Sequence, residues 1–350
     1  MTSKIFRIPA FAPGLAAAAA VCLGAWSASA AGPADAYKDR QMRFITMGSV
    51  GGGYDAYMRT ILPYVEKKTG AKMVPVNEPA AGGLSAMNRL VAAPADGHTI
   101  LLTTGEGAAG AQLFGLTGVN YDVRKLNWLA RVSGPPKIVM VGPKFPFPTF
   151  AEALKAKHTF IWGGSGKTDG NSDYQSVLSH ALGFDSRIIH GYKGSRGMNL
   201  AIEQGELDAR VITSEAAARF VRSGKFRVIL SLSRERAPEF PDVPTAYEVG
   251  KPSPAMAKWL DWRAGLTSLG RVIVAAPGTP KAKVDYLRAA LKEVLNDPAY
   301  IAEAKKRRLN PGYLDGETLQ KSVLEVMDAL DPKELAEVKE VILNKYYKKR

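Results

Sequence analysis

Strand-like and helix-like segments alternate through two long blocks of this 350-residue sequence. The first block covers residues 42–104 and the second residues 137–233, with glycine-rich turns between many of the segments. Such alternation predicts a parallel sheet in each block, with helices on both faces and binding at the carboxyl ends of the strands. We therefore expect two similar α/β lobes, with the chain returning to the first lobe after completing the second.

The first 30 residues have the pattern of an export signal. Lys4 and Arg7 precede an apolar run at residues 11–23, and the small residues "SASA" at 27–30 supply a cleavage site. The run contains a Pro-Gly pair and is shorter than the roughly 20 apolar residues that a membrane-spanning helix needs. We expect the mature, periplasmic protein to start near Ala31.

The lobe boundaries follow from the two blocks. Residues 31–140 and 231–350 are expected to form the first lobe, and residues 141–230 the second. The segments "KIVMVGP" and "FRVILSLS" would then be the strands that cross between the lobes.

Export and composition restrict the chemistry of the mature chain. The single cysteine, Cys22, lies inside the signal, so disulfides, thiol nucleophiles and cysteine metal sites are excluded. The formal charge of +14 suits an anionic ligand, nucleic acid or a membrane surface. Export makes nucleic acid the least suitable partner. The four histidines have no metal-binding spacing, so no metal is expected, and His190 is the one candidate for facing a cleft.

The stretch "FIWGGSGKTDGNSDYQ", residues 160–175, approaches the pattern of a phosphate-binding loop. That pattern needs a glycine where Ile161 stands, and it places its lysine at the start of the helix. Here loop formers follow Lys167, and the helix is expected to begin at Ser172, with Gln175 completing a capping box. A nucleotide hydrolase is not predicted, but a glycine-rich loop before a helix still favours an anion.

Two more glycine loops follow strands of the first block. Residues 51–53 leave backbone N–H groups open, and Asp55 is expected to cap a helix that begins near Ala56. Residues 82–83 form a similar loop. Three such loops, each after a predicted strand, suggest facing anion sites built from the main chain.

Two other motifs suggest functions that the sequence does not support. The stretch "GEGAAG", residues 105–110, matches the dinucleotide fingerprint, but no acidic residue follows at the distance needed to hold a ribose, and no cofactor is expected. Glu106 within it is either a polar group near the cleft or a solvated loop residue. An exported hydrolase is the alternative function. Its candidate nucleophiles, Ser165 and Ser214, lie outside any G-x-S-x-G motif.

Eight motifs in order resemble the receptors of tripartite tricarboxylate transporters, also called Bug receptors. They include "GGGYDAYMRTILPYVEKKTG", "VNEPAAGG", "PADGHTILL", "GELDARV" and "VAAPGTPKAKVDYL", and they cover nearly all of the mature chain. The resemblance implies a two-lobed periplasmic binding protein fold of the type II kind, with a ligand cleft between the lobes. It also implies a monomeric, non-enzymatic receptor that delivers a small organic carboxylate to membrane permease subunits.

The resemblance also implies where the ligand binds. In such receptors, main-chain groups and waters of first-lobe loops, here residues 50–55 and 79–84, hold a carboxylate. A second-lobe loop, here residues 165–168, closes over the far end of the ligand. Lys167 and Glu106 depart from the family pattern, and Lys167 either pairs with a second ligand carboxylate or is a solvated loop lysine. The predicted ligand-binding residues are Gly51, Gly52, Gly53, Tyr54, Asp55, Gly82, Gly83, Leu84, Thr104, Glu106, Ser165, Gly166, Lys167, Thr168, Asn171, Tyr192, Ser214 and Glu215.

Overall fold

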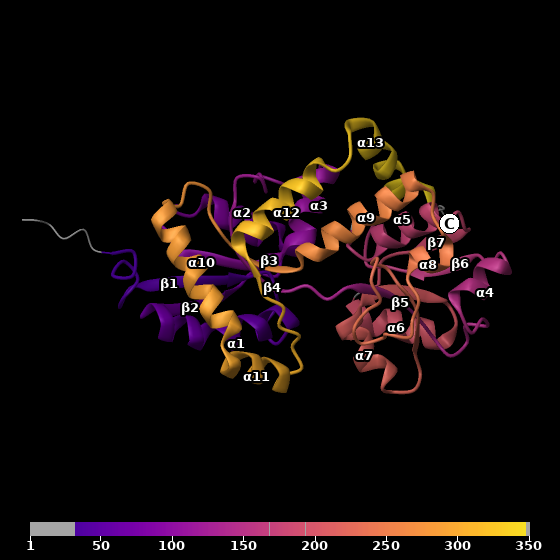
Figure 1. The fold of residues 1–350 in the computed structure, drawn as a ribbon, viewed down its shortest axis with the longest axis horizontal. Helices are drawn as coiled ribbons and strands as arrows, with labels where there is room; N and C mark the ends of the chain where they lie inside the picture. Colours follow the sequence, from indigo (N-terminus) through magenta and orange to yellow (C-terminus); the bar gives the residue numbers. More distant parts are fainter. Residues whose placement is uncertain (1–31, 168, 193, 348–350) are drawn as a thin grey trace, which may run out of the picture.

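The computed structural model describes residues 32–167, 169–192 and 194–347 and contains two α/β lobes that lie side by side (Figure 1). The expected export signal lies outside the described residues. In the described part of the chain, no helix is both long enough and apolar enough to cross a membrane.

The first lobe is built on a six-stranded mixed sheet with the order β11-β4-β10-β3-β1-β2. β1 pairs in parallel with β2 and β3, whereas β10 runs antiparallel to β3 and β4. The strands are β1 (Gln41–Thr46), β2 (Lys72–Asn77), β3 (Thr99–Thr104), β4 (Asn127–Ser133), β10 (Arg271–Ala275) and β11 (Leu314–Asp315).

Helices cover both faces of this sheet, because its central strands bury side chains on both sides. Phe44 and Leu102 pack in the cluster that contains α1, α10 and α11, whereas Ile45 and Leu101 pack in the cluster that contains α2, α3 and α12. The helices are α1 (Gly53–Thr69), η1 (Ala81–Gly83), α2 (Leu84–Ala92), α3 (Gly105–Phe114), α10 (Lys281–Asn296), α11 (Pro298–Lys306) and α12 (Gly316–Asp328).

The second lobe is built on a five-stranded mixed sheet with the order β7-β6-β8-β5-β9. β6 is parallel to β7 and β8, and β5 is antiparallel to β8 and β9. The strands are β5 (Lys137–Val141), β6 (Phe160–Gly163), β7 (Ser186–Ile189), β8 (Ala209–Thr213) and β9 (Arg227–Ser231). The helices are α4 (Phe150–Lys155), α5 (Ser172–Leu182), α6 (Gly194–Gln204), α7 (Ser214–Val221) and α8 (Ala246–Gly250).

The expectation of purely parallel sheets is wrong in both lobes. Each sheet takes in an antiparallel strand on which the chain arrives from the other lobe: β5 follows β4 after three residues, and β10 follows α9 (Pro254–Leu269). A strand that enters in this way has no crossover helix from the neighbour it pairs with, so it is not held to the parallel direction.

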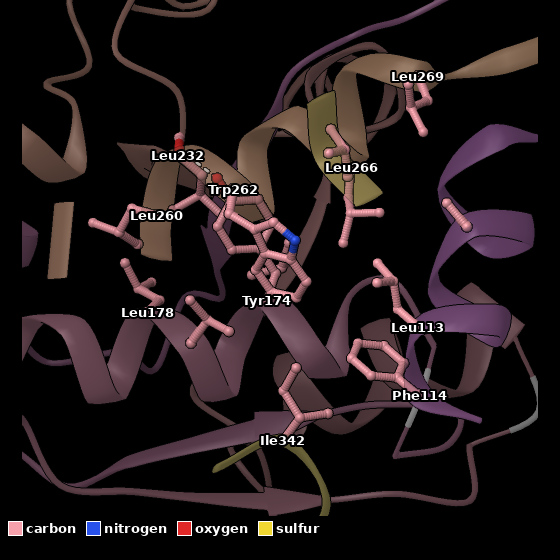
Figure 2. Close-up of a cluster of buried hydrophobic side chains, with 14 of the residues drawn as sticks. Leu113, Phe114, Tyr174, Leu178, Leu232, Leu260, Trp262, Leu266, Leu269 and Ile342 are labelled. Carbon is pink, nitrogen blue, oxygen red and sulfur yellow. Dashed lines mark hydrogen bonds between the residues drawn. The ribbon is translucent and has the colours of Figure 1, made fainter. Parts of the chain in front are cut away.

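The C-terminal segment also departs from the expectation that residues 231–350 belong to the first lobe. After α12, the helices α13 (Pro332–Glu340) and η2 (Val341–Lys345) lead back to the second lobe. The N–H of Ile188, in β7, donates to the carbonyl of Tyr346 over 3.1 Å. Ile342 is fully buried beneath α5 (Figure 2).

α9 joins the two lobes into one continuous core. It contacts α5 of the second lobe and α3 of the first, and its Trp262 meets Phe114 edge to face with ring centroids 6.5 Å apart. Figure 2 shows Leu113 and Phe114 on one side of this helix and Tyr174 and Leu178 below it. α9 thereby carries side chains to the boundary between the lobes.

Candidate ligand-binding site

A cavity of about 390 Å³ lies between the two lobes. This volume is within the range of small-molecule sites. Its walls come from η1 and the start of α2, from the end of β3 and the start of α3, and from the loop between β6 and α5. The N-terminal ends of three helices, two from the first lobe and one from the second, therefore converge on one space. Unpaired N–H groups and the helix dipole make such ends favourable to anions.

The η1 loop holds three consecutive residues in the left-handed conformation. The φ angles of Ala81, Gly82 and Gly83 are 49°, 63° and 102°. Glycine adopts this region freely, but for Ala81 it costs on the order of 1 kcal/mol. A Cβ on Gly83 would come within 3.0 Å of the Met47 sulfur, whereas one on Gly82 would meet nothing within 4 Å. The loop thus packs on Met47 at one residue and stays open at the next.

The start of α3 brings two predicted residues to the cavity. Thr104 is the N-cap, and its hydroxyl accepts from the N–H of Gly107 over 3.2 Å. Glu106 lies in the first turn and lines the cavity, yet its carboxylate points to partners from the second lobe and α9. It is therefore neither free in the cavity nor a solvated loop residue.

Glu106 belongs to a buried charge cluster at the boundary between the lobes. Its Oε1 accepts from Lys137 Nζ over 2.7 Å and from Arg263 Nη2. Arg263 Nε also donates to Asp173 Oδ1 over 3.0 Å, and both cations donate to the carbonyl of Gly170. The side chains of Lys137 and Arg263 are 4% and 0% exposed. The cluster thereby ties α3 of the first lobe to the β6–α5 loop of the second.

The charges of the cluster shift the ionisation of both acids. Burial alone would raise the pKa of Glu106, but Lys137 and Arg263 outweigh it and hold that pKa below its ordinary value. Burial raises the pKa of Asp173 to about 6 in spite of Arg263, with Glu106 adding to the rise. Glu106 is therefore ionised at neutral pH, whereas Asp173 takes up a proton in mildly acidic solution.

The β6–α5 loop already contains a carboxylate, that of Asp169. Its Oδ2 accepts from the N–H groups of Ser165 and Gly166 over 2.8 and 3.0 Å and from the hydroxyls of Ser165 and Ser172. Its Oδ1 accepts from the N–H groups of Asn171 and Ser172 over 2.8 and 3.1 Å. These hydrogen bonds outweigh burial and lower the pKa of Asp169. As predicted, α5 begins at Ser172, but Asp169 replaces the predicted capping box, and Gln175 donates to Gly163 instead.

The loop at residues 51–53 also donates a backbone N–H to a carboxylate of the chain, that of Asp55. The helix α1 begins at Gly53, earlier than expected, and Gly52 is its N-cap. Asp55 lies inside the first turn, where its Oδ2 accepts from the N–H of Gly51 over 2.8 Å and its Oδ1 from Arg59 over 2.9 Å. The predicted capping of a helix near Ala56 by Asp55 is thus wrong, because the helix already begins at Gly53, with Gly52 as its N-cap. None of these residues lines the described cavity.

The structure places seven of the predicted residues in the wall of the cavity and most others outside it. The seven are Gly82, Gly83, Leu84, Thr104, Glu106, Ser165 and Gly166. Thr168 lies outside the described residues.

Four predicted second-lobe residues have other surroundings. Asn171 is the residue before α5, and the N–H of Tyr192 donates to Gly164 over 3.3 Å. Ser214 is fully buried at the start of α7. Glu215 forms an ion pair with Arg271 of β10 over 3.6 Å, so it bridges the lobes. Tyr54, of the first lobe, lies under the same guanidinium, 5.6 Å from ring centroid to Arg271 Cζ.

Lys167 and His190 contact the C-terminal segment. Lys167 Nζ donates to the carbonyl of Leu343 over 2.7 Å and lies 5.0 Å from the ring centroid of Tyr347. It is neither a solvated lysine nor a lining residue of this cavity. The ring of His190 lies 5.4 Å from that of Tyr347, which places it against the C-terminal segment and not in the cleft.

Sequence reasoning missed four residues that shape the site. Lys137 and Arg263 stand among apolar neighbours, in "KIVMV" and "LDWRAGL", and a charge in such a setting indicates a buried ion pair. Asp169 and Asp173 lie just before and inside the start of α5, where an aspartate commonly accepts backbone N–H groups. The residue types gave a signal, but the partners become visible only in the fold.

Comparison with known proteins identifies the family. Residues 58–331 match the family described as the tripartite tricarboxylate transporter family receptor. The chain belongs to this family. Its members are solute-binding receptors, and the alternative of an exported hydrolase is not favoured. No group of three or more metal-binding side chains occurs among the described residues.

Individual relatives agree with this assignment. A UPF0065 protein of Bordetella pertussis is 25% identical over 314 residues, which cover 87% of this chain and 92% of that protein. The structure of a TctC solute binding protein from Polaromonas has a TM-score of 0.68 at 19% identity, over 87% of this chain and 99% of that one. The structure of MatC from Rhodopseudomonas palustris with bound malate has a TM-score of 0.62 at 22% identity. The match covers 86% of this chain and 99% of that one. The predicted two-lobed binding protein fold is confirmed.

Proposed function

We propose that this chain captures a small organic carboxylate between its lobes, in the periplasm, and delivers it to the membrane permease subunits of a tripartite transporter. One observation carries the proposal: three helix N-termini and the left-handed η1 loop surround a single cavity that spans both lobes. Backbone N–H groups and helix dipoles stabilise a carboxylate there without a charged side chain. The malate bound to MatC supports a ligand of this chemical class.

Binding and release require no covalent chemistry in this proposal. The carboxylate first contacts the first-lobe wall, at η1 and the starts of α2 and α3. The lobes then close, and the β6–α5 loop covers the far end of the ligand and excludes water. The connections between β4 and β5, between α9 and β10 and between α12 and α13 are the segments about which such closure would turn. Small-angle scattering should therefore show compaction on addition of a saturating ligand, and an unchanged radius of gyration would contradict the closure.

Export and assembly form a separate part of the proposal. The pattern of residues 1–30 favours cleavage before Ala31, and the receptor is proposed to act as a monomer. Intact-mass measurement of periplasmic material should show loss of the first 30 residues. Sedimentation of the same material with and without ligand would reveal any stable dimer.

A thermal-shift screen over small organic acids tests the capture itself. A ligand at 100 times its dissociation constant adds about 2.7 kcal/mol to the free energy of unfolding, which is readily seen as a higher melting temperature. Each acid that binds should be recovered with unchanged mass after prolonged incubation. A converted acid would favour the hydrolase alternative, and the absence of any stabilising acid would contradict the proposed function.

A further inference from the structure

The cavity lacks the side chains that would pair with a second negative charge. Among the described lining residues, the charged groups are two carboxylates, those of Glu106 and Asp169, and there is no lysine, arginine or histidine. The cations near these residues do not line the cavity. Lys137 and Arg263 pair with Glu106, and Lys167 bonds to the C-terminal segment. Arg210, which interacts electrostatically with Asp169, donates from Nη1 to Asn199 Oδ1 over 3.1 Å.

The second-lobe loop has filled its own anion site. Asp169 accepts six hydrogen bonds. Four come from backbone N–H groups and two from the hydroxyls of Ser165 and Ser172; the backbone donors are Ser165, Gly166, Asn171 and Ser172. A carboxylate offers about four lone-pair sites, so this one is saturated by the loop and the start of α5. It holds the position at the helix N-terminus that a ligand carboxylate would otherwise take.

The first-lobe wall is different. Within the described residues, no side-chain carboxylate accepts a hydrogen bond from Ala81, Gly82 or Gly83, and the space above Gly82 is open. Beyond this loop the wall becomes apolar, with Leu84, Met87, Ala108, Leu116 and Tyr121. The first-lobe wall thus offers an open loop for a carboxylate and apolar side chains for the body of a ligand, whereas the second-lobe loop contributes the carboxylate of Asp169.

We propose that this receptor selects monocarboxylates with an uncharged, largely apolar body and discriminates against dicarboxylates of the same length. The inference rests on the proposed function, because it assumes that the cavity holds a carboxylate at all. A second carboxylate would have to lie against Asp169, where like charges repel and the N–H donors of the loop are already used. The charge of Glu106, by contrast, is balanced by Lys137 and Arg263.

Matched acid pairs test the selectivity on the mature chain, residues 31–350. Butyrate and succinate, hexanoate and adipate, and benzoate and terephthalate would each be titrated calorimetrically at pH 7.5. The expected result is binding of at least one monoacid, about tenfold or more tighter than its diacid partner. Equal or tighter binding of the diacid in the pairs that bind overturns the selectivity but leaves a carboxylate receptor. Binding of no acid overturns the proposed function and the inference with it.

A variant of the loop tests the cause of the selectivity. Asp169→Asn removes the internal charge with little change of shape, and the diacid should gain about tenfold in affinity while its monoacid partner changes by less than about threefold. Asp185→Asn, at an exposed aspartate in the turn after α5, removes the same charge elsewhere in the lobe and should change neither. An unaltered ratio of diacid to monoacid affinity in a folded Asp169→Asn protein would overturn the role of Asp169. Should this variant not fold, the acid pairs on the unaltered chain still decide the selectivity.

Discussion

The two loops that line the cavity from opposite lobes differ in how their backbone N–H groups are hydrogen-bonded. Both follow a strand, contain glycines and lead into a helix with unpaired N–H groups. In the loop at residues 81–83, Ala81 is left-handed, only the N–H of Gly83 has an acceptor among the described residues, the carbonyl of Ala80, and no carboxylate of those residues fills the loop. The loop at residues 165–170 satisfies its N–H groups with Asp169. A glycine-rich loop therefore indicates a place where an anion fits, but the chain itself can supply that anion.

The largest expected effect comes from breaking the cluster that holds the second loop against the first lobe. Arg263→Met leaves Glu106 and Asp173 buried with one cation fewer, so the free energy of unfolding should fall by about 3–5 kcal/mol. Urea denaturation measures it. Arg307→Met, at an exposed i,i+4 pair with Glu303, is the control and should cost less than about 0.5 kcal/mol. Similar losses for the two variants would show that the cluster does not join the lobes.

The pH dependence of stability should report Asp173 within the same cluster. Its pKa of about 6 in the folded chain exceeds the ordinary value, so the folded state binds the extra proton. Stability should therefore fall, by on the order of 2 kcal/mol, as the pH rises from about 4 to 6. Glu106, whose pKa is lowered, acts oppositely and loses its contribution as the pH falls below about 4.5.

Urea midpoints between pH 4 and 7, compared with those of Asp173→Asn, measure this slope. The variant should lack the fall between pH 4 and 6. A fall of equal size in both proteins would assign it to other groups.

The third effect concerns the open loop. Gly83→Ala places a Cβ at a φ of 102° and 3.0 Å from the Met47 sulfur, so stability should fall by about 2 kcal/mol and affinity for the bound acid should fall with it. Gly53→Ala is a matched control, because a Cβ there meets nothing within 4 Å and the residue is helical. Thermal melts and titration of the same acid compare the two. Unchanged affinity in Gly83→Ala would show that the loop at residues 81–83 does not contribute to ligand binding.

The smallest effect is expected at Lys167. Loss of its bond to Leu343 and its contact with Tyr347 in Lys167→Ala should cost about 1 kcal/mol of stability. The ratio of monoacid to diacid affinity should not change, because the ammonium group does not line the cavity. A selective loss of diacid binding in this variant would instead make Lys167 a partner of the second carboxylate.

Much of the fold could be predicted from the sequence because its signals are local. The predicted alternation of strands and helices in residues 42–104 and 137–233 is present, since apolar periodicity and glycine turns specify these elements locally. The antiparallel direction of β5 and β10, the helix α9 and the return of η2 to the second lobe were not predicted. They depend on partners far away in the sequence, which local periodicity does not encode.

The residues of the candidate site show the same difference between local signals and distant contacts. Gly82, Gly83, Thr104, Ser165 and Gly166 line the cavity, and each stood out through glycine or hydroxyl chemistry at a strand end. By contrast, the pairing of Glu106 with Lys137 and Arg263 joins residues 31 and 157 positions apart. Such pairs follow from the packing of α9 between the lobes and not from any motif.

The return of the C-terminal segment sets the order in which the second lobe can be completed. Its strands are made in the middle of the chain. The N–H of Ile188 in β7 can donate to the carbonyl of Tyr346, and Ile342 can cover α5, only when nearly the whole chain exists. A chain emerging gradually from a ribosome or a translocation pore would therefore expose the α5 surface until the end. Contacts of such large sequence separation slow folding and keep a partly made chain loose. This favours passage through a membrane before folding, and truncation at residue 331 should leave a second lobe that is assembled but poorly closed.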